Sequence, residues 1–448
     1  MSISNILNIS KQALLAHQSA IDTTSNNISN MNTEGYTRRL TNFDQGLGIN
    51  RISQNVSDET VSRVRNRFVE KQFLQQNSYY NKYEMDRTVS QQIEDIFSEP
   101  GEAGLSNSLS EFWTAWSDLA NDPENQSVRT VVKDKSQALA NNFNRVYNDL
   151  NQLKDSLKND LTGKVESVNQ RLRQLNEINK QLNTTKTEDL LDQRDKLLSE
   201  LSELINIDSN IGDGGKVSVY SNGQILVTEN QAKELKLRTN QDSENSELII
   251  TTTKNSDSIK IKAGEIGSLL TMNNEIIPQY QERLNTLASD LAKEVNKIHR
   301  AGYNLNNVSG INFFAENVKS AGDFRVNRTV VNNPALIATS DIMNESGNNN
   351  IAQKITNLQE GSIVRGITPG EFYSALVTEV GSRVQESEYL SSSQQKVVKT
   401  LENQRDASSG VSLDEEMINL TKYEQGYQAA AKVVNTVNDM MTTVLNLV

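Results

Sequence analysis

Residues 413–448 read LDEEMINLTKYEQGYQAAAKVVNTVNDMMTTVLNLV. Apolar and aromatic side chains recur in this segment at alternating steps of three and four residues, which predicts a helix with one continuous apolar edge. Ser412 and Glu415 have the spacing of a capping box, so the start of the helix is also specified. An edge of this length must be covered by another helix. The residues predicted to pack there are Leu420, Tyr423, Tyr427, Val434, Val437, Met441 and Val444.

A weaker apolar edge lies near the N-terminus. Its residues recur every seven positions, and the alternate positions on the same edge are polar, so the predicted helix would be marginal by itself. The helix at 413–448 is its natural partner, either in the same chain or in a neighbouring copy. The residues predicted to pack on this edge are Leu7, Leu14, Ile21 and Ile28.

The composition excludes several classes of function. The 448 residues include 45 Lys and Arg against 57 Asp and Glu, a net charge of −12, which argues against binding to nucleic acid or insertion at an anionic membrane. Cysteine is absent, so no disulfide framework is expected. No cleavable signal peptide and no membrane span are visible. With 35% hydrophobic and 5% aromatic residues, the chain suits long amphipathic helices better than one large core.

The pattern changes in the middle of the chain. Glycines at 212–215 break a helical stretch, and Asn222-Gly223 between two apolar runs is a strong signal for a type I′ hairpin. The predicted fold is therefore mainly α with a small inserted β domain, with terminal helices forming a coiled coil, a long helical-bundle domain and an outer β-rich domain. We expect an N-terminal helix at 1–36, an extended linker at 37–60, a helical domain at 61–208, 263–302 and 366–410, the β domain at 209–262, loops and short strands at 303–365, and the C-terminal helix at 411–448.

Breaks in the apolar pattern set the expected helix limits. One helix is predicted over 61–97. Asp122 and Pro123 are expected to start a second one, as N-cap and first helical residue, and this helix should run to about Asn206. Further helices are expected over 264–302 and 369–405.

No catalytic set is apparent in the sequence. His17 lies on the N-terminal edge and is best explained as a tolerated polar residue, whereas His299 lies near a predicted helix end and can interact with the helix dipole. No nucleophile elbow is present, and zinc is not expected without Cys or paired His. The sequence GDGGK at 212–216 lacks the spacing of a P-loop, so a turn before a strand is favoured. No cofactor is therefore expected.

Two groups of charged residues each have two interpretations. Asp189, Asp192 and Asp195 fall at helical spacing, and a solvated helix face is preferred because a calcium loop would need a Gly turn and a closing Glu. A group of cations near residue 65 is either a solvated face, which is slightly favoured, or a contact with an acidic neighbouring subunit. These cations are Arg63, Arg65, Arg67 and Lys71.

Residues 25–38, SNNISNMNTEGYTR, resemble the N-terminal signature of the flagellar rod, hook and hook-associated proteins. In that family a helix ends in Asn-Asn-(Ile/Leu)-Ala-Asn and is followed by an Asn-Thr-Pro-Gly-(Tyr/Phe) turn. Asparagine accepts left-handed geometry and bonds nearby backbone, which suits the closure of a helix. Glu34 stands where the family pattern has proline. The signature residues in this chain are Asn26, Asn27, Asn30, Asn32, Gly35 and Tyr36.

Further segments narrow the resemblance to the hook-associated protein 1 family. This resemblance implies a non-enzymatic, secreted subunit of the bacterial flagellum that leaves the cell by type III export and joins the hook to the filament. The implied partners are like copies of the chain in a ring, the hook protein, hook-associated protein 3, and a cytosolic export chaperone that covers the C-terminal helix. The matching segments occur in the family's order at 116–123, 190–195, 264–270, 295–299 and 409–427.

Three alternatives remain open from the sequence. Another axial protein, flagellin or hook-associated protein 3, is the nearest, although the segments at 190–195 and 264–270 argue against it. A cytosolic coiled-coil adaptor would share the helical pattern but would not be found outside the cell. A secreted wall hydrolase would need a catalytic set that the sequence does not offer.

Overall fold

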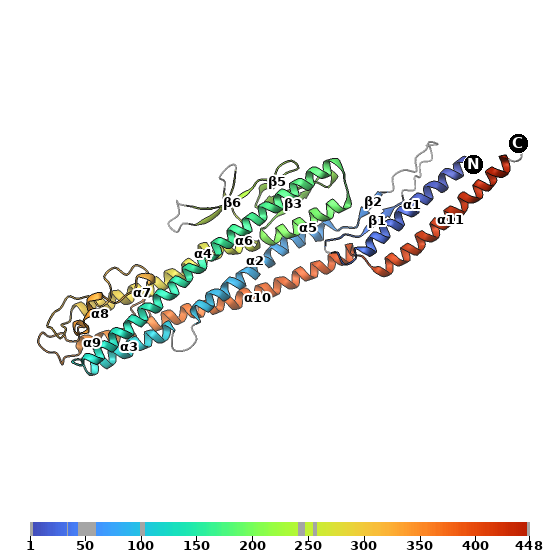
Figure 1. The fold of residues 1–448 in the computed structure, drawn as a ribbon. Coiled ribbons are helices and arrows are strands. Elements are labelled where there is room, and N and C mark those ends of the chain that lie inside the picture. Colours follow the sequence, from blue (N-terminus) through green and yellow to red (C-terminus); the bar gives the residue numbers. More distant parts are fainter. Residues whose placement is uncertain are drawn as a thin grey trace. The chain divides into compact units, whose positions relative to one another are not determined.

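The computed structural model describes residues 3–33, 35–43, 60–98, 104–240, 247–253 and 258–445. It confirms the predicted fold class, because long helices account for most of the chain and the strands form small sheets (Figure 1). The chain divides into two compact units, to both of which α2 (Arg67–Phe97), α4 (Gln126–Thr184) and α10 (Pro369–Ser409) contribute residues. Unit 1 comprises Met1–Ser78, Asn169–Glu234 and Gln395–Val448, and unit 2 comprises Tyr79–Val168 and Leu235–Gln394.

Unit 1 contains both terminal helices. These are α1 (Ile3–Ser29) and α11 (Leu413–Leu445). Strand β1 (Arg39–Asn42) follows α1 and pairs antiparallel with β2 (Thr60–Arg63), which places Arg39 opposite Arg63. The second part of α4 packs against α5 (Glu188–Leu204) because both helices carry aliphatic side chains at helical spacing. The buried residues at this contact are Ile178, Leu182 and Leu191.

A three-stranded antiparallel sheet completes unit 1. Its strands are β3 (Asp208–Ile211), β4 (Val217–Ser221) and β5 (Gln224–Val227), in that order. The turn between β4 and β5 has φ values of 46° at Asn222 and 81° at Gly223. A type I′ turn requires this pair of left-handed residues, so the predicted hairpin is confirmed.

Unit 2 contains the remaining helices and a second sheet. The sheet has three antiparallel strands, so the predicted β insertion folds as two small sheets, one in each unit. The strands are β6 (Leu235–Thr239), β7 (Leu248–Thr252) and β8 (Ser258–Ile259), and the helices are α3 (Leu105–Asn121), α6 (Gly264–Thr271), α7 (Ile277–Arg300), α8 (Arg328–Asn332) and α9 (Asn350–Thr356).

The core of unit 2 is aromatic. The ring centroids of Trp116 and Phe313 are 5.0 Å apart, and those of Phe314 and Phe324 are 4.5 Å apart. The Phe112 ring lies 6.4 Å from Phe313 and 5.9 Å from Phe314. All five rings are fully buried. Because each buried aromatic ring removes a large apolar area from water, a few of them suffice to hold α3 against the segment 311–326.

A π-helical turn, Met272–Ile276, separates α6 from α7. Asn274 lies in this turn, and its Oδ1 accepts a hydrogen bond from Leu248 N at 2.9 Å while its Nδ2 donates to Leu248 O at 2.8 Å. The side-chain amide therefore pairs with β7 as the backbone of an added strand would. It ties the second sheet to the helices of unit 2.

The predicted start of α2 at residue 61 is wrong. Residues 60–63 form strand β2, and α2 begins at Arg67. Asn66 caps this helix, because its Oδ1 accepts a hydrogen bond from Phe68 N at 3.1 Å. A capping asparagine fixes a helix start more strongly than apolar spacing does, so the helix begins after Asn66 and not at residue 61.

The predicted helix start at Asp122 and Pro123 is also wrong. Asp122 is the C-cap of α3, a helix that the apolar pattern did not predict. The next helix, α4, begins at Gln126 because Asn125 acts as its cap, accepting a hydrogen bond from Ser127 N at 2.9 Å.

The long helix expected to reach Asn206 is interrupted. It ends at Thr184, and α5 begins at Glu188 after the sequence Thr-Lys-Thr, whose β-branched residues favour extended backbone. Between 303 and 365 the structure has short helices and isolated bridges in place of the expected strands. The helix predicted over 369–405 is observed as α10 and extends to Ser409.

Candidate functional site

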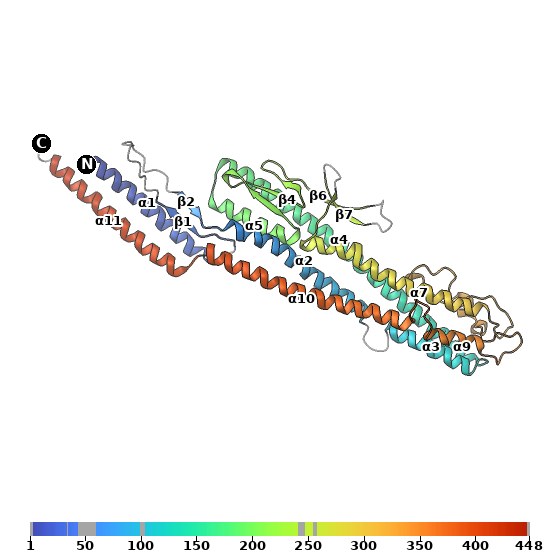
Figure 2. The ribbon, with the colours of Figure 1, turned by 180° about the vertical axis from the view of Figure 1, so that it is seen from behind.

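The terminal helices α1 and α11 lie side by side in both views (Figures 1 and 2). The fully buried residues of α1 are small or polar, although the sequence places an aliphatic edge on this helix. Small side chains let two helices approach closely, so the pair is held by a narrow and tight strip of contact. The buried residues are Ser10, Ala20, Thr23, Thr24 and Asn27 in α1, and Glu416, Ala430 and Val437 in α11.

One close approach on this strip joins His17 to Gly426. A Cβ atom at Gly426 would lie 2.4 Å from His17 Cε1 and 2.6 Å from His17 Nε2, so only glycine fits there without a shift of the helices. The centroid of the His17 ring also lies 5.8 Å from that of Phe43 and 6.4 Å from that of Tyr423. His17 is therefore a packing residue of the helix pair.

The aliphatic edges identified in the sequence flank this strip and are only partly covered within one chain. Val437 is buried, whereas Tyr427 and Met441 are exposed. The side chain of Val444 lies outside the described residues. The other residues of the two edges are half-buried, namely Leu7, Leu14, Ile21, Ile28, Leu420, Tyr423 and Val434.

More apolar side chains on the paired helices remain in water. Ile9 and Leu15 of α1 are 55% and 53% exposed, and Ile418 of α11 is 69% exposed. Single exposed apolar residues are ordinary, whereas a contiguous patch of them would mark a surface that binds another protein. We call the following residues the outer apolar set: Ile9, Leu15, Met417, Ile418, Val433 and Met440.

The turn after α1 is closed by asparagine side chains. Asn30 donates to Asn26 O from both its backbone N–H, at 3.0 Å, and its Nδ2, at 2.9 Å. Thr33 N in turn donates to Asn30 O at 2.9 Å. Gly35 has a φ of 82°, in the left-handed region that glycine adopts without strain. Asn32 is exposed in the same turn.

Asn27, which is buried, uses all of its side-chain hydrogen-bonding capacity. Its Oδ1 accepts from the Tyr36 hydroxyl at 2.8 Å and from Arg39 N at 3.0 Å. Its Nδ2 donates to Arg39 O at 2.9 Å and to Glu416 Oε2 at 3.1 Å. Burial raises the pKa of the Tyr36 phenol, so the hydroxyl keeps the proton that it donates. One amide thus joins the end of α1, the start of β1 and the first turn of α11.

Arg38 makes a second link between the two ends of the chain. Its Nε donates to Glu416 Oε1 at 2.7 Å, and its Nη1 donates to Glu415 Oε2 at 2.8 Å. The Glu416 side chain is 2% exposed and that of Glu415 is 62% exposed. A buried carboxylate must be compensated by charge and hydrogen bonds, which Arg38 and Asn27 supply. The sequence indicated a capping role for Glu415 and no role for Glu416.

Asp195 of α5 is an ion-pair centre beside this turn. Its carboxylate pairs with three guanidinium groups, those of Arg63, Arg65 and Arg194. Burial, together with the neighbouring Arg65 and Arg63 charges, lowers the pKa of Arg194 to about 9. Burial also lowers the pKa of Arg63 and that of Arg65. The three cations can be held together only because a carboxylate lies between them.

This cluster corrects the interpretation of the aspartates as a solvated helix face. Arg39 Nη2 lies 2.5 Å from Asp189 Oδ1 and 3.1 Å from Asp192 Oδ2, and Arg63 Nε lies 3.3 Å from Asp192 Oδ1. The pairing of β1 with β2 brings Arg39 and Arg63 together opposite α5, which helical spacing alone could not reveal. Of the three aspartates, only Asp189 keeps a largely exposed side chain.

The interpretation of the neighbouring cations as a solvated face is corrected in part. The side chains of Arg63 and Arg65 are buried or nearly so in the ion-pair cluster. Arg67 and Lys71 are exposed.

His299 in unit 2 is fully buried, which corrects its assignment to a helix-dipole contact. Its Nε2 accepts a hydrogen bond from Ala338 N at 2.9 Å, so Nδ1 carries the proton and donates to Ile311 O at 2.7 Å. Burial lowers the pKa of His299 to about 4, and the ring is therefore neutral. A neutral imidazole that holds the backbone of two segments has a structural role.

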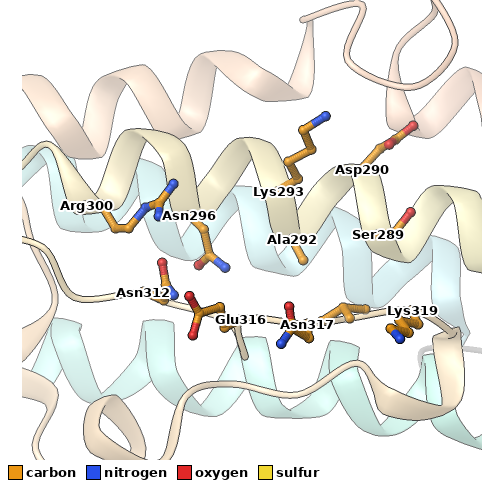
Figure 3. A pocket seen from close by; sticks show the side chains of 11 residues that line it. Ser289, Asp290, Ala292, Lys293, Asn296, Arg300, Asn312, Glu316, Asn317 and Lys319 are labelled. Carbon is orange, nitrogen blue, oxygen red and sulfur yellow. The ribbon is translucent and has the colours of Figure 1, made fainter.

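A polar groove of about 450 Å³ lies between α7 and the segment 312–319 (Figure 3). Charged side chains of both signs line it, including Asp290, Lys293 and Glu316. Ser289 could act as a nucleophile only if its hydroxyl were free, but its Oγ donates to Thr286 O within the helix at 3.2 Å. The groove offers no paired nucleophile and base, so its geometry does not indicate catalysis.

Two further observations apply to the described ranges of the chain. No group of three or more His, Cys, Asp or Glu residues is placed there to hold a metal ion. None of the helices in these ranges combines the length and the hydropathy needed to cross a membrane.

The terminal segments and the central segment of the chain match different protein families. Residues 7–37 match the flagella basal body rod protein family, and residues 402–447 match the C-terminal family of the flagellar basal body rod FlgEFG proteins. Residues 90–314, half of the chain, match the helical domain of the flagellar hook-associated protein FlgK. The chain belongs to the FlgK family. It is a structural protein of the flagellum and not an enzyme, as the resemblance found in the sequence implied.

Individual members of the FlgK family align along nearly the whole chain. Flagellar hook-associated protein 1 of Bacillus subtilis is 27% identical, over 98% of this chain and 97% of its own length. The protein of the same name from Escherichia coli is 24% identical, over 99% of this chain and 100% of its own length. The solved flagellar hook junction protein FlgK from Burkholderia pseudomallei has a TM-score of 0.69 at 15% identity, covering 76% of this chain and 100% of its own, and supports the fold.

Proposed function

We propose that this chain forms the junction between the hook and the filament of the flagellum, as a ring of like subunits that assemble through their terminal helices. The observation that carries the proposal is the outer apolar set on α1 and α11. The contact within one chain is a narrow strip, and it leaves both the outer set and parts of the aliphatic edges in water. Neighbouring helix pairs in a ring would cover these side chains.

The energy available from this assembly is substantial. Full burial of one Ile, Leu or Met side chain contributes about 1.5–3 kcal/mol relative to leaving it exposed. Ile9, Leu15 and Ile418 are each more than half exposed, and the methionines and Val433 add to them. Each subunit can therefore gain several kcal/mol from a neighbour, before the loss of motional freedom on association is subtracted.

The turn and the ion-pair cluster support a mechanical role for unit 1. Asn27 and Arg38 both bind Glu416, so the end of α1 and the start of α11 are fixed to each other. Arg39 continues from this turn to the aspartates of α5. A load applied to the terminal helices would thus pass into α5 through hydrogen bonds and ion pairs rather than through a flexible linker.

The family resemblance suggests the export route of the chain and the proteins that contact the ring. In our proposal the chain passes unfolded through the type III export channel and acts outside the cell. The hook protein lies on one side of the ring and hook-associated protein 3 on the other. Before export, a cytosolic chaperone covers α11, whose exposed Met417, Ile418 and Met440 would otherwise promote aggregation.

Two kinds of variant test this proposal in the source bacterium. Deletion of residues 413–448 should abolish incorporation into flagella, and cells with no copy of the chain should carry hooks without filaments. The sharper variant is Ile418→Ser with Met440→Ser, because both side chains are exposed in the single chain and their change should leave its stability within about 0.5 kcal/mol. Tyr389→Ser on α10 is the matched control, since Tyr389 is also strongly exposed but lies outside the terminal pair.

Electron microscopy of the variant cells and immunodetection on isolated flagella give the result. The double serine variant should be exported but absent from the flagellum, whereas the Tyr389 variant should be incorporated normally. Normal incorporation of the double serine variant, or filaments in cells that lack the chain, would overturn the proposal.

A further inference from the structure

Two loops of unit 2 present apolar side chains from a firmly held backbone. The first loop covers residues 304–310 and the second covers 340–346, beside α8 and α9 (Figure 1). Tyr303 and Ser340 form an antiparallel bridge at their base, with Tyr303 N donating to Ser340 O at 2.7 Å. Asn307 Oδ1 accepts a hydrogen bond from Asn344 N at 2.8 Å, which joins the loops a second time.

Each loop is also fixed internally. Asn304 Oδ1 accepts from Asn306 N at 2.9 Å and from Val308 N at 3.1 Å. Asn307 and Asn344 have φ values of 59° and 64°, and asparagine is the non-glycine residue that tolerates this left-handed geometry best. The backbone of both loops is therefore specified by side chains and does not depend on a partner.

The residues next to these fixing points are apolar and exposed. Val308 follows Asn307 in the chain, and Ile342 and Met343 precede Asn344. They are 46%, 48% and 54% exposed, respectively. The rest of these loops is rich in Asn and Ser, so polar residues suit their geometry and three aliphatic side chains are not needed for folding. A preorganised apolar group of this kind binds with little loss of conformational freedom.

Carboxylates dominate the surroundings of these apolar residues. Asp341 and Glu345 belong to the second loop, and Glu124 accepts a hydrogen bond from Ser346. Lys354, at 3.4 Å from Asp341, offsets one of the three, and Arg300, whose carbonyl accepts a hydrogen bond from Gly310 N at 3.0 Å, adjoins the first loop. A symmetric contact between two copies would bring these carboxylates against their own counterparts, which like-charge repulsion disfavours. A head-to-tail contact would bring them against another face of a chain whose net charge is −12, which is also a poor match for an acidic surface. An apolar surface flanked by Lys or Arg would complement them instead.

We infer that Val308, Ile342 and Met343, with Glu124, Asp341 and Glu345 around them, form a docking surface for a different protein subunit. We call it the two-loop surface. Its partner presents an apolar side chain flanked by lysine or arginine and is not another copy of this chain. This inference rests on the proposed function, because a junction subunit needs a contact with an unlike neighbour in addition to contacts within its own ring.

Photochemical cross-linking in assembled flagella tests the two-loop surface. Met343 is replaced by the photoreactive residue p-benzoylphenylalanine, and the same replacement at Tyr389 serves as the control for an exposed position elsewhere in unit 2. Flagella are isolated and irradiated, and mass spectrometry identifies the cross-linked chains. We expect a product between position 343 and one other flagellar protein, within a few residues of a Lys or Arg of that protein. The control should not give this product.

A charge variant tests the chemistry of the contact. Glu345→Lys should lower the yield of the product at least fivefold, whereas Glu360→Lys, a change of another exposed glutamate, should leave it unaltered. Cross-linking to a second copy of this chain alone, or no cross-linking in flagella that contain the chain, would overturn the inference. The proposed function would survive either result, because it is tested separately, by the incorporation of the Ile418→Ser/Met440→Ser variant and by the appearance of cells that lack the chain.

Discussion

Asn27 of α1 donates a hydrogen bond to Glu416 of α11, with 3.1 Å between Nδ2 and Oε2, across 389 positions of the chain. Both residues are buried. The amide belongs to the family signature turn, whereas the carboxylate belongs to the first turn of the last helix. The signature turn therefore contributes directly to the joining of the two terminal helices.

Replacing Asn27 with Asp should weaken the contact between the end of α1 and the start of α11. The variant keeps the shape of the side chain but removes both donated hydrogen bonds and places a second carboxylate beside Glu416. Unpaired buried polar groups and a buried like-charge pair predict a loss of about 2–4 kcal/mol in local stability. Amide hydrogen exchange at Arg39, whose N–H is bonded to Asn27, measures the loss directly. Asn32→Asp, in the exposed part of the same turn, should change this exchange rate little.

Glu415 and Glu416 form a matched pair for a second experiment. Both bind Arg38, but only Glu416 is buried. Glu416→Gln should therefore cost about 3 kcal/mol in the free energy of opening of the terminal pair, and Glu415→Gln should cost less than about 0.5 kcal/mol. Exchange rates along the first turns of α11 distinguish the two variants. Equal effects would show that burial does not decide the strength of this contact.

Gly426→Ala should stabilise α11 as an isolated helix but weaken its contact with α1 in the full chain. In an isolated peptide of residues 413–445, alanine should raise helix content, since it is more favourable than glycine by about 1 kcal/mol. In the full chain the new Cβ would overlap the His17 ring and should push the helices apart. Circular dichroism of the peptide and amide exchange of the full chain measure the two effects. The second change His17→Ala should restore protection in the full chain, and failure of this rescue would contradict the contact.

The apolar pattern predicted the terminal helices and the hairpin because both depend on neighbours in sequence. The residues at 413–448 repeat at helical steps, and Asn222-Gly223 specifies its turn locally. The pattern put polar residues at alternate positions of the N-terminal edge, but it could not show that Ser10 and Thr24 are buried while Leu14 is only half-buried, because small polar residues carry no hydrophobic signal.

Long-range contacts account for the parts of the site that sequence reasoning missed. Glu416 looks like an ordinary acidic residue in the first turn of a helix until Asn27 and Arg38 are brought to it from the other end of the chain. Asp195 looks solvated until Arg63 and Arg65 are brought to it from an earlier part of the chain. The ion-pair partners of such a residue come from distant parts of the chain, so the spacing of residues in the sequence cannot predict them.

The stability of unit 2 should fall at acid pH because of His299. Its folded pKa of about 4 lies below the ordinary value of 6.5, so the unfolded chain binds the proton more readily. The stability contributed by the neutral ring is complete above pH 6.5 and is lost as the pH falls through 6.5 toward 4. Between pH 7 and pH 5 the loss from this group should be about 2 kcal/mol.

Tryptophan fluorescence during urea unfolding can follow this change. Both tryptophans of the chain, Trp113 and Trp116, lie in α3, and the Trp116 ring is 6.4 Å from His299 between centroids. His299→Gln should unfold more easily at pH 7 and should lose less stability than the unaltered chain between pH 7 and pH 5. An unchanged pH dependence would assign the effect to other groups.

The pairing of α1 with α11 also has a consequence for the order in which the molecule is made. A ribosome synthesises α1 long before α11, because α1 ends at Ser29 and α11 begins only at Leu413. Until α11 has been synthesised, α1 has no partner helix, and neither Asn27 nor Arg38 can bind the Glu416 carboxylate. The tight strip between the two helices can therefore form only after α11 has been synthesised, so most of unit 1 can fold before its terminal helices pair.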